Sequence, residues 1–239
     1  MSKTTIPTGG ITADAVSEEH LDVTAITGHS AITSLADTDK FLVSDASDSN
    51  NLKYVEKQYL PGGSSVLLHE ATVTGETGGS DDYEDSAYFA HATYDKFRVY
   101  IDDYNPQNDG QNLRLRLKLG GTYRTDNYEY HTKLFQAGSD AAVNRSTGAD
   151  HIRIIDDTGN ASDELARGWF EYTAIECSSG DFKPLIKYSF VTATSGGSVQ
   201  GGWGAGLCEN STGTLTGFRL TPSGGGLGDY KIRIYGMKS

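Results

Sequence analysis

Strict alternation of apolar and polar residues is the feature that most constrains how this chain can fold. Leucine and a basic residue take turns over Leu113–Leu119, and the same two-residue period recurs at Phe97–Ile101 and Tyr230–Tyr235. Successive side chains of a strand point to opposite faces of a sheet, so each run predicts a strand with one buried face and one wet face. Strands of this kind are typical of antiparallel sheets.

Short apolar runs separated by turn residues extend this pattern over residues 62–239. Gly, Asn, Asp and Ser gather between the runs, for example at Asn108–Gly110 and Ser223–Gly226, and these residues favour tight turns. Roughly ten strands at such spacing predict an all-β fold, an antiparallel two-sheet sandwich that is jelly-roll-like. The expected strands are Val66–Thr74, Tyr88–Ala92, Phe97–Ile101, Leu113–Leu119, Tyr128–Phe135, Ile152–Ile155, Trp169–Cys177, Leu185–Thr194, Gln200–Cys208, Thr216–Thr221 and Lys231–Tyr235.

Residues 1–30 are polar, and their few apolar residues follow neither the helical nor the strand period. Such a segment cannot bury one regular face and cannot by itself offset the entropy lost on ordering. We therefore expect an extended N-terminal arm that a partner chain holds. The expected anchoring and assembly residues are Ile6, Ile11, Val16, His20, Leu21 and Ile26. In a trimer, three copies of His20 would offer an ion site or a pH-sensitive contact.

Residues 31–61 predict a small β-hairpin that acts as an adaptor between arm and sandwich. Its strands are expected at Thr38–Asp45 and Asn51–Val55, followed by one helical turn over Glu56–Leu60. A lone two-stranded hairpin is only marginally stable in water. We expect it to pack on the larger domain or on a symmetry mate.

The net charge, the N-terminal residues and the lack of long apolar runs limit which functions are expected. A net charge of −12 disfavours binding to a nucleic-acid backbone, which requires basic stripes. The first residues lack the apolar core of a secretory signal, and no run of about 18 apolar residues predicts a membrane span. We expect synthesis in the host cytoplasm without export. Cys177 and Cys208 are expected to be buried thiols, and a disulfide between them is the alternative.

The closing strands, together with several earlier segments, resemble structural proteins of marine tailed bacteriophages. The resemblance is to β-sandwich domains of tail fibres and capsid fibres, and to the attachment segments near the N-termini of such fibres. The segments that carry it are Leu215–Gly224, Gly228–Gly236, Tyr94–Leu117, Asn127–Tyr130, Ile11–Val16, Ser17–Asp22 and Leu35–Tyr54.

This resemblance implies a homotrimer on the exterior of the virion. The N-terminal arm would join other virion proteins of the tail or capsid, and the sandwich would project outward. The chain has no repetitive shaft, so the implied role is a short fibre or spike that contacts the host surface, with host glycan as the expected ligand. The alternative role is a capsid decoration or cement protein, a head fibre that stabilises the shell.

Catalysis is not expected. The chain has no Gly-x-Ser-x-Gly elbow, no His-Glu-x-x-His motif and no phosphate-binding loop. Its many acidic residues are therefore interpreted as parts of solvated loops. A glycan-cleaving appendage is the remote alternative, because a glycosidase needs two carboxylates at a defined separation. Asp102–Asp103 and Asp156–Asp157 are conceivable calcium ligands, but we predict neither a metal site nor a cofactor.

Aromatic residues are the candidates for receptor binding. Tyr123, Tyr128 and Tyr130 surround the Gly120–Gly121 turn, and we expect them to form an exposed patch, since tyrosine offers rigid contact area with a polar tip. Trp203 lies in a glycine-rich segment. It is a candidate platform for sugar stacking, but the pattern favours a place in the core between the sheets.

Overall fold

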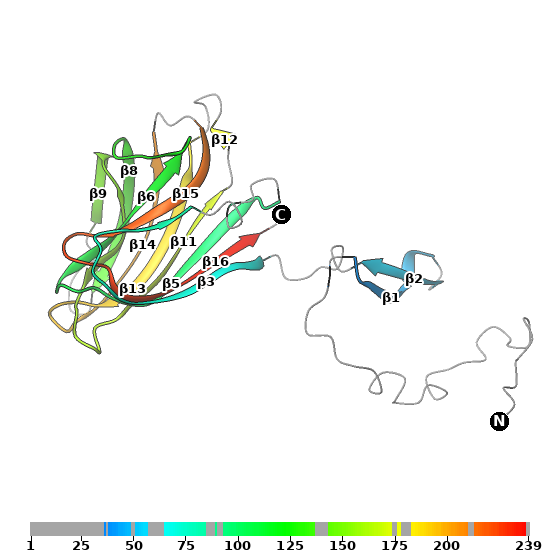
Figure 1. Cartoon of the computed structure of the whole chain (residues 1–239), viewed down its shortest axis with the longest axis horizontal. Helices are drawn as coiled ribbons and strands as arrows, with labels where there is room; N and C mark the ends of the chain where they lie inside the picture. The colour runs from blue at the N-terminus through cyan, green and yellow to red at the C-terminus, as the bar shows by residue number, and fades with distance from the viewer. Residues whose placement is uncertain are drawn as a thin grey trace, which may run out of the picture. The chain divides into compact units, whose positions relative to one another are not determined.

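The computed structural model describes residues 36, 38–48, 51–56, 65–84, 89, 93–136, 143–173, 176–177, 183–209 and 213–237. The chain divides into two compact units, residues 1–62 and 63–239, and each is treated by itself. All strand pairings in the described part are antiparallel. The second unit is a two-sheet sandwich, which confirms the predicted all-β fold class (Figure 1).

The larger layer is an eight-stranded sheet in the order β3-β16-β5-β11-β13-β14-β8-β9. Neighbours in this order are often distant in sequence, so the sheet forms only when the whole unit folds. Its strands are β3 (Ser65–Glu76), β16 (Gly228–Met237), β5 (Lys96–Asn105), β11 (Ala166–Thr173), β13 (Leu185–Ala193), β14 (Val199–Cys208), β8 (Tyr128–Gln136) and β9 (Val143–Ala149).

The smaller layer is a six-stranded sheet with the central order β10-β6-β15-β12. Two short strands complete it, since β4 pairs with β15 and β7 pairs with β6. Its strands are β10 (Ile152–Thr158), β6 (Gln111–Leu119), β15 (Gly213–Pro222), β12 (Glu176–Cys177), β4 (Asp81–Tyr83) and β7 (Thr122–Tyr123).

The alternating runs bury their apolar side chains between the two layers. All four leucines of β6 are buried, and the basic residues between them are half-buried on the outer face. Aromatic rings fill the centre of the core, where the Phe218 ring centroid lies 5.1 Å from that of Tyr83 and 5.1 Å from that of Phe170. Rings in such arrangements contribute beyond the area that they bury.

Three expectations about strands are wrong in detail. The predicted strand Trp169–Cys177 is two strands, because β11 joins the larger sheet whereas β12 pairs with β15 in the smaller one. Of the predicted strand Tyr88–Ala92, only Phe89 is described, and it is a buried residue outside any strand. Strands β4, β7 and β9 were not expected, because they are short or carry mostly polar residues.

The first unit contains a hairpin of β1 (Lys40–Asp45) and β2 (Asn51–Glu56), joined through the 3-10 helix η2 (Ala46–Asp48). Leu42 lies directly opposite Tyr54, and the two side chains are 73% and 60% exposed. The Lys40 ammonium lies 4.2 Å from the centroid of the Tyr54 ring. This face of the hairpin therefore presents apolar side chains that its own two strands do not cover.

Several predicted features lie outside the described residues. These are the helical turn after Glu56 and the whole anchoring set of the arm, Ile6, Ile11, Val16, His20, Leu21 and Ile26. Cys208 is buried in β14, whereas the side chain of Cys177 is not described, so the redox state of this pair stays a prediction.

Candidate functional site

The most distinctive surface of the sandwich follows β14 along the outer face of the larger sheet. This strand contains Gly201-Gly-Trp-Gly-Ala-Gly206, so its outer face has small residues on either side of one large ring. Trp203 is 58% exposed. Larger side chains of the neighbouring strands β13 and β8 rise on either side of Gly201–Gly206. We call the surface along this segment the β14 furrow.

Gly202 and Gly204 lie on the inner face of β14, and packing beneath the sheet explains why they are glycines. A Cβ atom at Gly202 would lie 2.6 Å from the Phe190 ring, and one at Gly204 would lie 2.6 Å from the Tyr188 ring. Phe190 and Tyr188 stand directly opposite these two glycines on β13. The rings occupy the space that side chains of β14 would otherwise fill, so packing beneath the sheet requires glycine here.

Strand register fixes what borders the furrow. Trp203 lies between Ser189 of β13 and Lys133 of β8. Two residues further along, Ala205 lies between Lys187 and His131. These six side chains share the outer face because residues of one strand that lie an even number of positions apart point to the same side.

Apolar side chains are exposed beside Trp203. Phe135 and Val191 lie on either side of Gly201, and they are 52% and 49% exposed. A Cβ atom at Gly201 would come within 2.4 Å of the Phe135 ring, so this ring leans over the bare backbone. Clusters of exposed apolar side chains are typical of surfaces that bind a ligand or another macromolecule.

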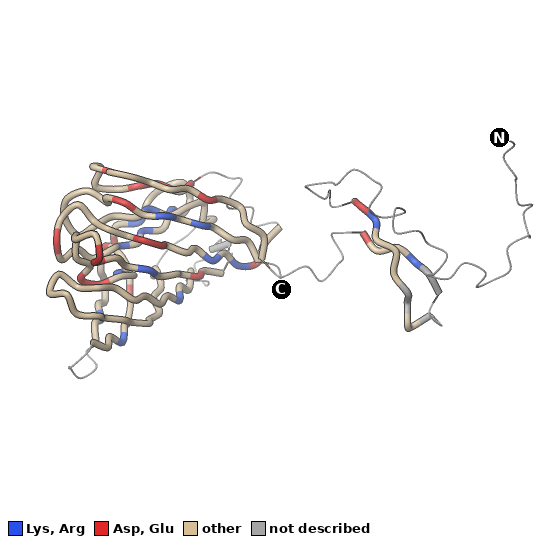
Figure 2. Tube along the Cα trace, turned by 90° about the horizontal axis from the view of Figure 1, so that it is seen from below, with Lys and Arg blue, Asp and Glu red and all other residues tan. Residues whose placement is uncertain are grey.

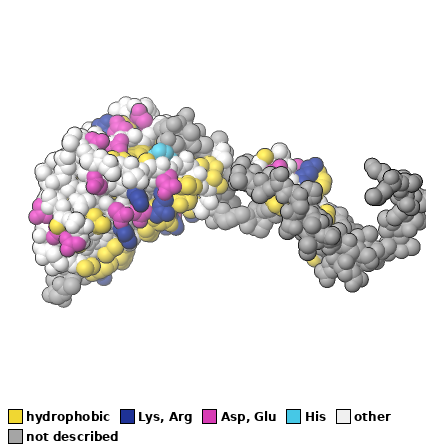
Figure 3. All heavy atoms as spheres, turned by 60° about the horizontal axis from the view of Figure 1, so that its bottom comes forward, with side chains coloured by type: hydrophobic (Ala, Val, Ile, Leu, Met, Phe, Trp, Pro, Cys, Tyr) yellow, Lys and Arg dark blue, Asp and Glu magenta, His cyan; other side chains and the backbone are white. Residues whose placement is uncertain are grey.

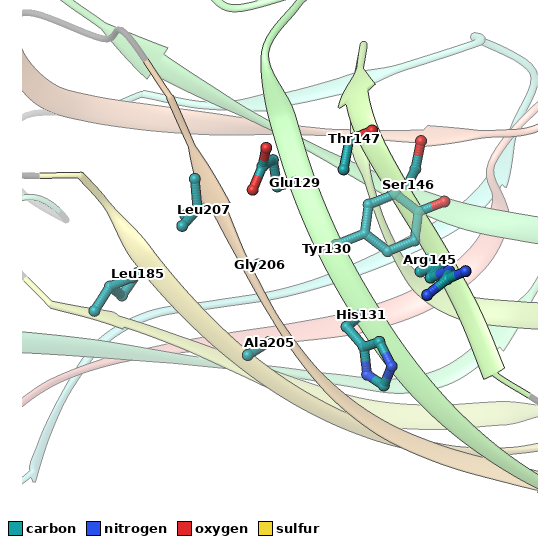
Figure 4. A pocket seen from close by; sticks show the side chains of 10 residues that line it. All are labelled: Glu129, Tyr130, His131, Arg145, Ser146, Thr147, Leu185, Ala205, Gly206 and Leu207. Carbon is teal, nitrogen blue, oxygen red and sulfur yellow. The ribbon is translucent and has the colours of Figure 1, made fainter.

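One end of the furrow deepens into a hollow of about 630 Å³ (Figure 4). Leu185 and Leu207 form its apolar side, and Ala205 leaves room at its centre. Arg145 of the edge strand β9 lies directly opposite His131. The hollow is lined by Glu129, Tyr130, His131, Arg145, Ser146, Thr147, Leu185, Ala205, Gly206 and Leu207.

An aromatic row continues from the furrow towards the other edge of the sheet. Tyr100 of β5 pairs with Trp169 of β11, and Trp169 pairs with Ser189 next to Trp203. The guanidinium carbon of Arg98 lies 5.0 Å from the centroid of the Trp169 ring. Trp169 is thus partly covered, and Trp203 is the open aromatic residue of the row. On the face drawn in Figure 3, hydrophobic side chains lie among charged ones.

Most arginines of the sandwich are held by carboxylates, and Figure 2 shows both signs of charge along its strands. Around the furrow the situation differs, because Lys133, Lys187 and Arg145 form no ion pair with any described residue. The ion pairs within the described sandwich that involve lysine or arginine are Arg98–Glu171, Arg116–Asp150, Lys118–Glu84, Arg124–Asp126, Arg153–Asp156, Arg167–Asp103, Lys183–Glu209, Arg219–Asp82 and Arg233–Asp102.

The predicted receptor-binding residues do not form one patch. Tyr128 and Tyr130 are buried, so the expectation of an exposed aromatic patch is wrong for both. The Tyr128 hydroxyl oxygen accepts a hydrogen bond from the Leu117 amide, and burial raises the pKa of this phenol well above its ordinary value. Both tyrosines belong to the core, and Tyr130 also lines the hollow.

Tyr123 lies in the smaller sheet, away from the β14 strand. It is half-buried, and its ring lies beneath the Arg219 guanidinium at 4.1 Å. Its hydroxyl donates a hydrogen bond to Glu84. The preference for Trp203 as a core residue is also wrong, because the strand turns this ring outward and the inner positions on either side are glycines.

Sequence reasoning missed the remaining residues of the furrow. The outward orientation of Lys133 and Phe135 could have been predicted, because the alternation of β8 places both on the face opposite its buried residues. Arg145 was not, since β9 was not predicted at all. The hollow depends on which strands adjoin β14, and pairing between distant strands is not encoded in a local pattern.

Two arrangements considered from the sequence, a pair of catalytic carboxylates and a cluster of metal ligands, are not found among the described residues of this surface. Glu129 is the one carboxylate among the residues that line the hollow, and glycoside hydrolysis needs two. No group of three or more His, Cys, Asp and Glu in the described part could hold a metal ion. Asp102, Asp103 and Asp156, which are conceivable calcium ligands by sequence, each form an ion pair with an arginine.

No helix within the described residues is long and apolar enough to cross a bilayer. Comparison with protein-family models, with curated proteins and with solved structures finds no match to this chain. The assignment of a site therefore depends on the chain's own residues, and these single out the β14 furrow.

Proposed function

We propose that this chain is a structural subunit on the exterior of a tailed bacteriophage particle, a trimeric short fibre or spike that contacts the host surface. Its N-terminal arm joins the particle, and its sandwich carries the binding face. The residue segments that resemble phage fibre proteins support the virion role. The β14 furrow supports the contact role.

The exposed ring of Trp203 is the observation that carries the contact role. A large apolar ring that is more than half exposed gains by covering its face, and burial of apolar surface contributes about 25 cal/mol for each square ångström. The ring lies between Lys133, whose ammonium can donate hydrogen bonds, and Ser189, whose hydroxyl donates to the Gly202 carbonyl oxygen and can still accept a hydrogen bond. An aromatic platform with polar groups at its rim suits a glycan, whose sugar rings combine an apolar C–H face with hydroxyl groups.

The β1-β2 hairpin supports assembly with other copies. Leu42 and Tyr54 form an exposed cross-strand pair on a hairpin in which no described side chain is buried. Three such hairpins around a common axis would cover these side chains, as cyclic assemblies do. Removal of residues 1–30 should leave the sandwich folded but unable to join particles, and normal incorporation of the shortened chain would contradict the attachment role.

A capsid decoration protein is the second candidate, because exposed apolar residues on the hairpin would equally suit a clamp on shell subunits. Locating the subunit by cryo-electron microscopy of the intact particle separates the two roles. Density at the tail with the sandwich pointing away supports host attachment. Density at shell vertices or hexamer centres supports decoration.

Binding of the purified protein to host cells tests the contact role directly. Trp203→Ala should lower the amount bound at least about tenfold, equivalent to about 1.4 kcal/mol. Val66→Ala is the matched control, because Val66 is also exposed but lies on β3, at the opposite edge of the sheet. Equal binding by both variants would rule out the furrow as the contact surface.

A glycan-cleaving role falls well behind these two. Incubation with host polysaccharide should release no oligosaccharide, since the described residues that line the hollow include one carboxylate. Release of oligosaccharide would overturn the non-enzymatic assignment.

A further inference from the structure

We infer that the β14 furrow selects an anionic glycan, a polysaccharide whose sugar units carry carboxylate or sulfate groups. This inference rests on the proposed glycan contact and specifies its ligand. The observation behind it is the juxtaposition of an open aromatic ring with basic side chains that the described part of the chain leaves without carboxylate partners.

Register places the basic groups in a line across the furrow. Lys187, Ala205, His131 and Arg145 occupy one row over four neighbouring strands. With strands about 4.8 Å apart, Lys187 and Arg145 are separated by about 14 Å of sheet. Lys133 stands next to Trp203 in the adjacent row. The cations therefore frame both the ring and the hollow.

Neighbouring carboxylates leave these cations available. Glu171 faces Lys187 across the strands, but Arg98 holds its carboxylate at 2.6 Å. Among the described residues that line the hollow, Glu129 is the only acidic residue beside Arg145 and His131. Lys133, Lys187 and Arg145 against Glu129 leave the furrow with a formal charge of about +2 when His131 is neutral.

The net charge of the whole chain opposes an anionic ligand, so the distances decide which effect wins. The chain carries −12, but at physiological salt the Debye length is about 8 Å. Carboxylates beyond that distance are largely screened, and several near the furrow are already paired with arginine. The local cations therefore dominate for a ligand that lies against the sheet.

The hollow offers matched chemistry for one acidic sugar unit. Arginine binds carboxylate and sulfate oxygens in a two-pronged arrangement, and Arg145 stands beside the hydroxyl groups of Ser146 and Thr147. Leu185 and Leu207 on the other side provide an apolar wall for a sugar C–H face. A neutral glycan would use the wall and Trp203 but would leave the cations unused.

The first test measures binding of the full chain to three polymers by affinity electrophoresis. Polygalacturonate carries carboxylates, dextran sulfate carries sulfates, and dextran is uncharged. We expect retardation by at least one of the anionic polymers and weaker retardation by dextran, with the difference shrinking as salt is raised. Comparing the two anionic polymers identifies which acidic group the furrow takes.

The second test replaces charges at matched positions. Lys133→Gln with Lys187→Gln should weaken binding to the anionic polymer by about tenfold, since each exposed charge contributes up to about 1 kcal/mol. Lys96→Gln with Lys231→Gln removes the same charge from two exposed lysines on β5 and β16 of the same sheet. This control pair should change binding less than twofold, roughly the scatter of such measurements.

Four outcomes would overturn the inference. Equal retardation by dextran and the anionic polymers would leave a glycan contact without charge selection. Equal weakening by both lysine pairs would reduce the effect to net charge. A change of oligomeric state in Trp203→Ala, measured by analytical ultracentrifugation, would make the furrow an interface between copies. Loss of host-cell binding by Trp203→Ala together with no binding to any anionic polymer would retain the proposed function and reject the anionic ligand.

Discussion

The outer face of the smaller sheet and the β14 furrow both lie on the outside of the sandwich, but their basic side chains differ in whether they form ion pairs. On the smaller sheet, Arg116, Lys118 and Arg219 each meet a carboxylate, and Arg219 also covers the Tyr123 ring. In the furrow, Lys133 and Lys187 meet none among the described residues, and Trp203 is open. The first surface pairs these three cations with its own carboxylates, whereas the second leaves its two lysines without an ion pair among the described residues.

The largest expected effect is a difference in stability between substitutions on the inner and outer faces of β14. Gly204→Ala places a Cβ atom 2.5 Å from the His131 carbonyl oxygen and 2.6 Å from the Tyr188 ring, and such overpacking costs about 1–3 kcal/mol. Ala205→Leu, one residue along, points into the hollow and should change the unfolding free energy by less than about 0.5 kcal/mol.

Chemical denaturation measures both changes. The comparison predicts that Gly204→Ala loses stability whereas Ala205→Leu, by filling the hollow, loses glycan binding. Equal stability loss in the two variants would mean that the outer face of β14 is packed as tightly as its inner face.

A smaller effect compares the two outer surfaces. Arg219→Ala removes a two-pronged ion pair with Asp82 and the cover of the Tyr123 ring, so it should lower the unfolding free energy by about 1 kcal/mol. Trp203→Ala removes an exposed ring and should cost less. Thermal or urea unfolding of both variants checks this order, and a greater loss for Trp203→Ala would assign the ring a structural role.

The smallest effect concerns pH at the edge of the smaller sheet. Burial lowers the pKa of His151 below its ordinary value of 6.5, with Arg114 and Arg116 acting in the same direction and the hydrogen bond with Asp150 opposing them. The unfolded chain therefore binds a proton more readily than the folded chain. Stability from this group is present above pH 6.5 and is lost as the pH falls below that value.

His151→Gln should flatten this pH dependence, as unfolding curves between neutral and mildly acidic pH would reveal. His131→Gln is the control, because His131 is exposed beside the furrow. A steeper loss of stability in acid for His151→Gln would contradict the assigned direction of the pKa shift.

Alternation in the sequence predicted the fold class because a two-residue period directly encodes which face of a strand is buried. It worked where the period is strict, as in Leu113–Leu119, and failed at β12, where a continuous strand-like run passes from one sheet to the other. At Tyr128 and Tyr130 the expectation that failed was an exposed aromatic patch, since both rings are buried in the core. The parity of β8 already assigned both residues to the buried face.

The site was less accessible to sequence reasoning than the fold. Trp203 was recognised as a binding candidate, but a glycine-rich strand has no apolar partners by which to judge its faces. Phe190 and Tyr188 of β13 determine which face of β14 points inward, because their rings occupy the space beneath its inner glycines. Such a decision depends on which strand lies alongside, and that is a property of the assembled sheet.

The position of β3 has a mechanical consequence. This edge strand joins the sandwich to the residues that precede it, and its first residue, Ser65, pairs with Met237 near the end of β16. A pull on the preceding chain directed along β3, away from the domain, loads the hydrogen bonds between β3 and β16 together, in shear, rather than opening them one after another. A domain tethered in this way resists tension along its tether far better than a sideways peel of the same strand.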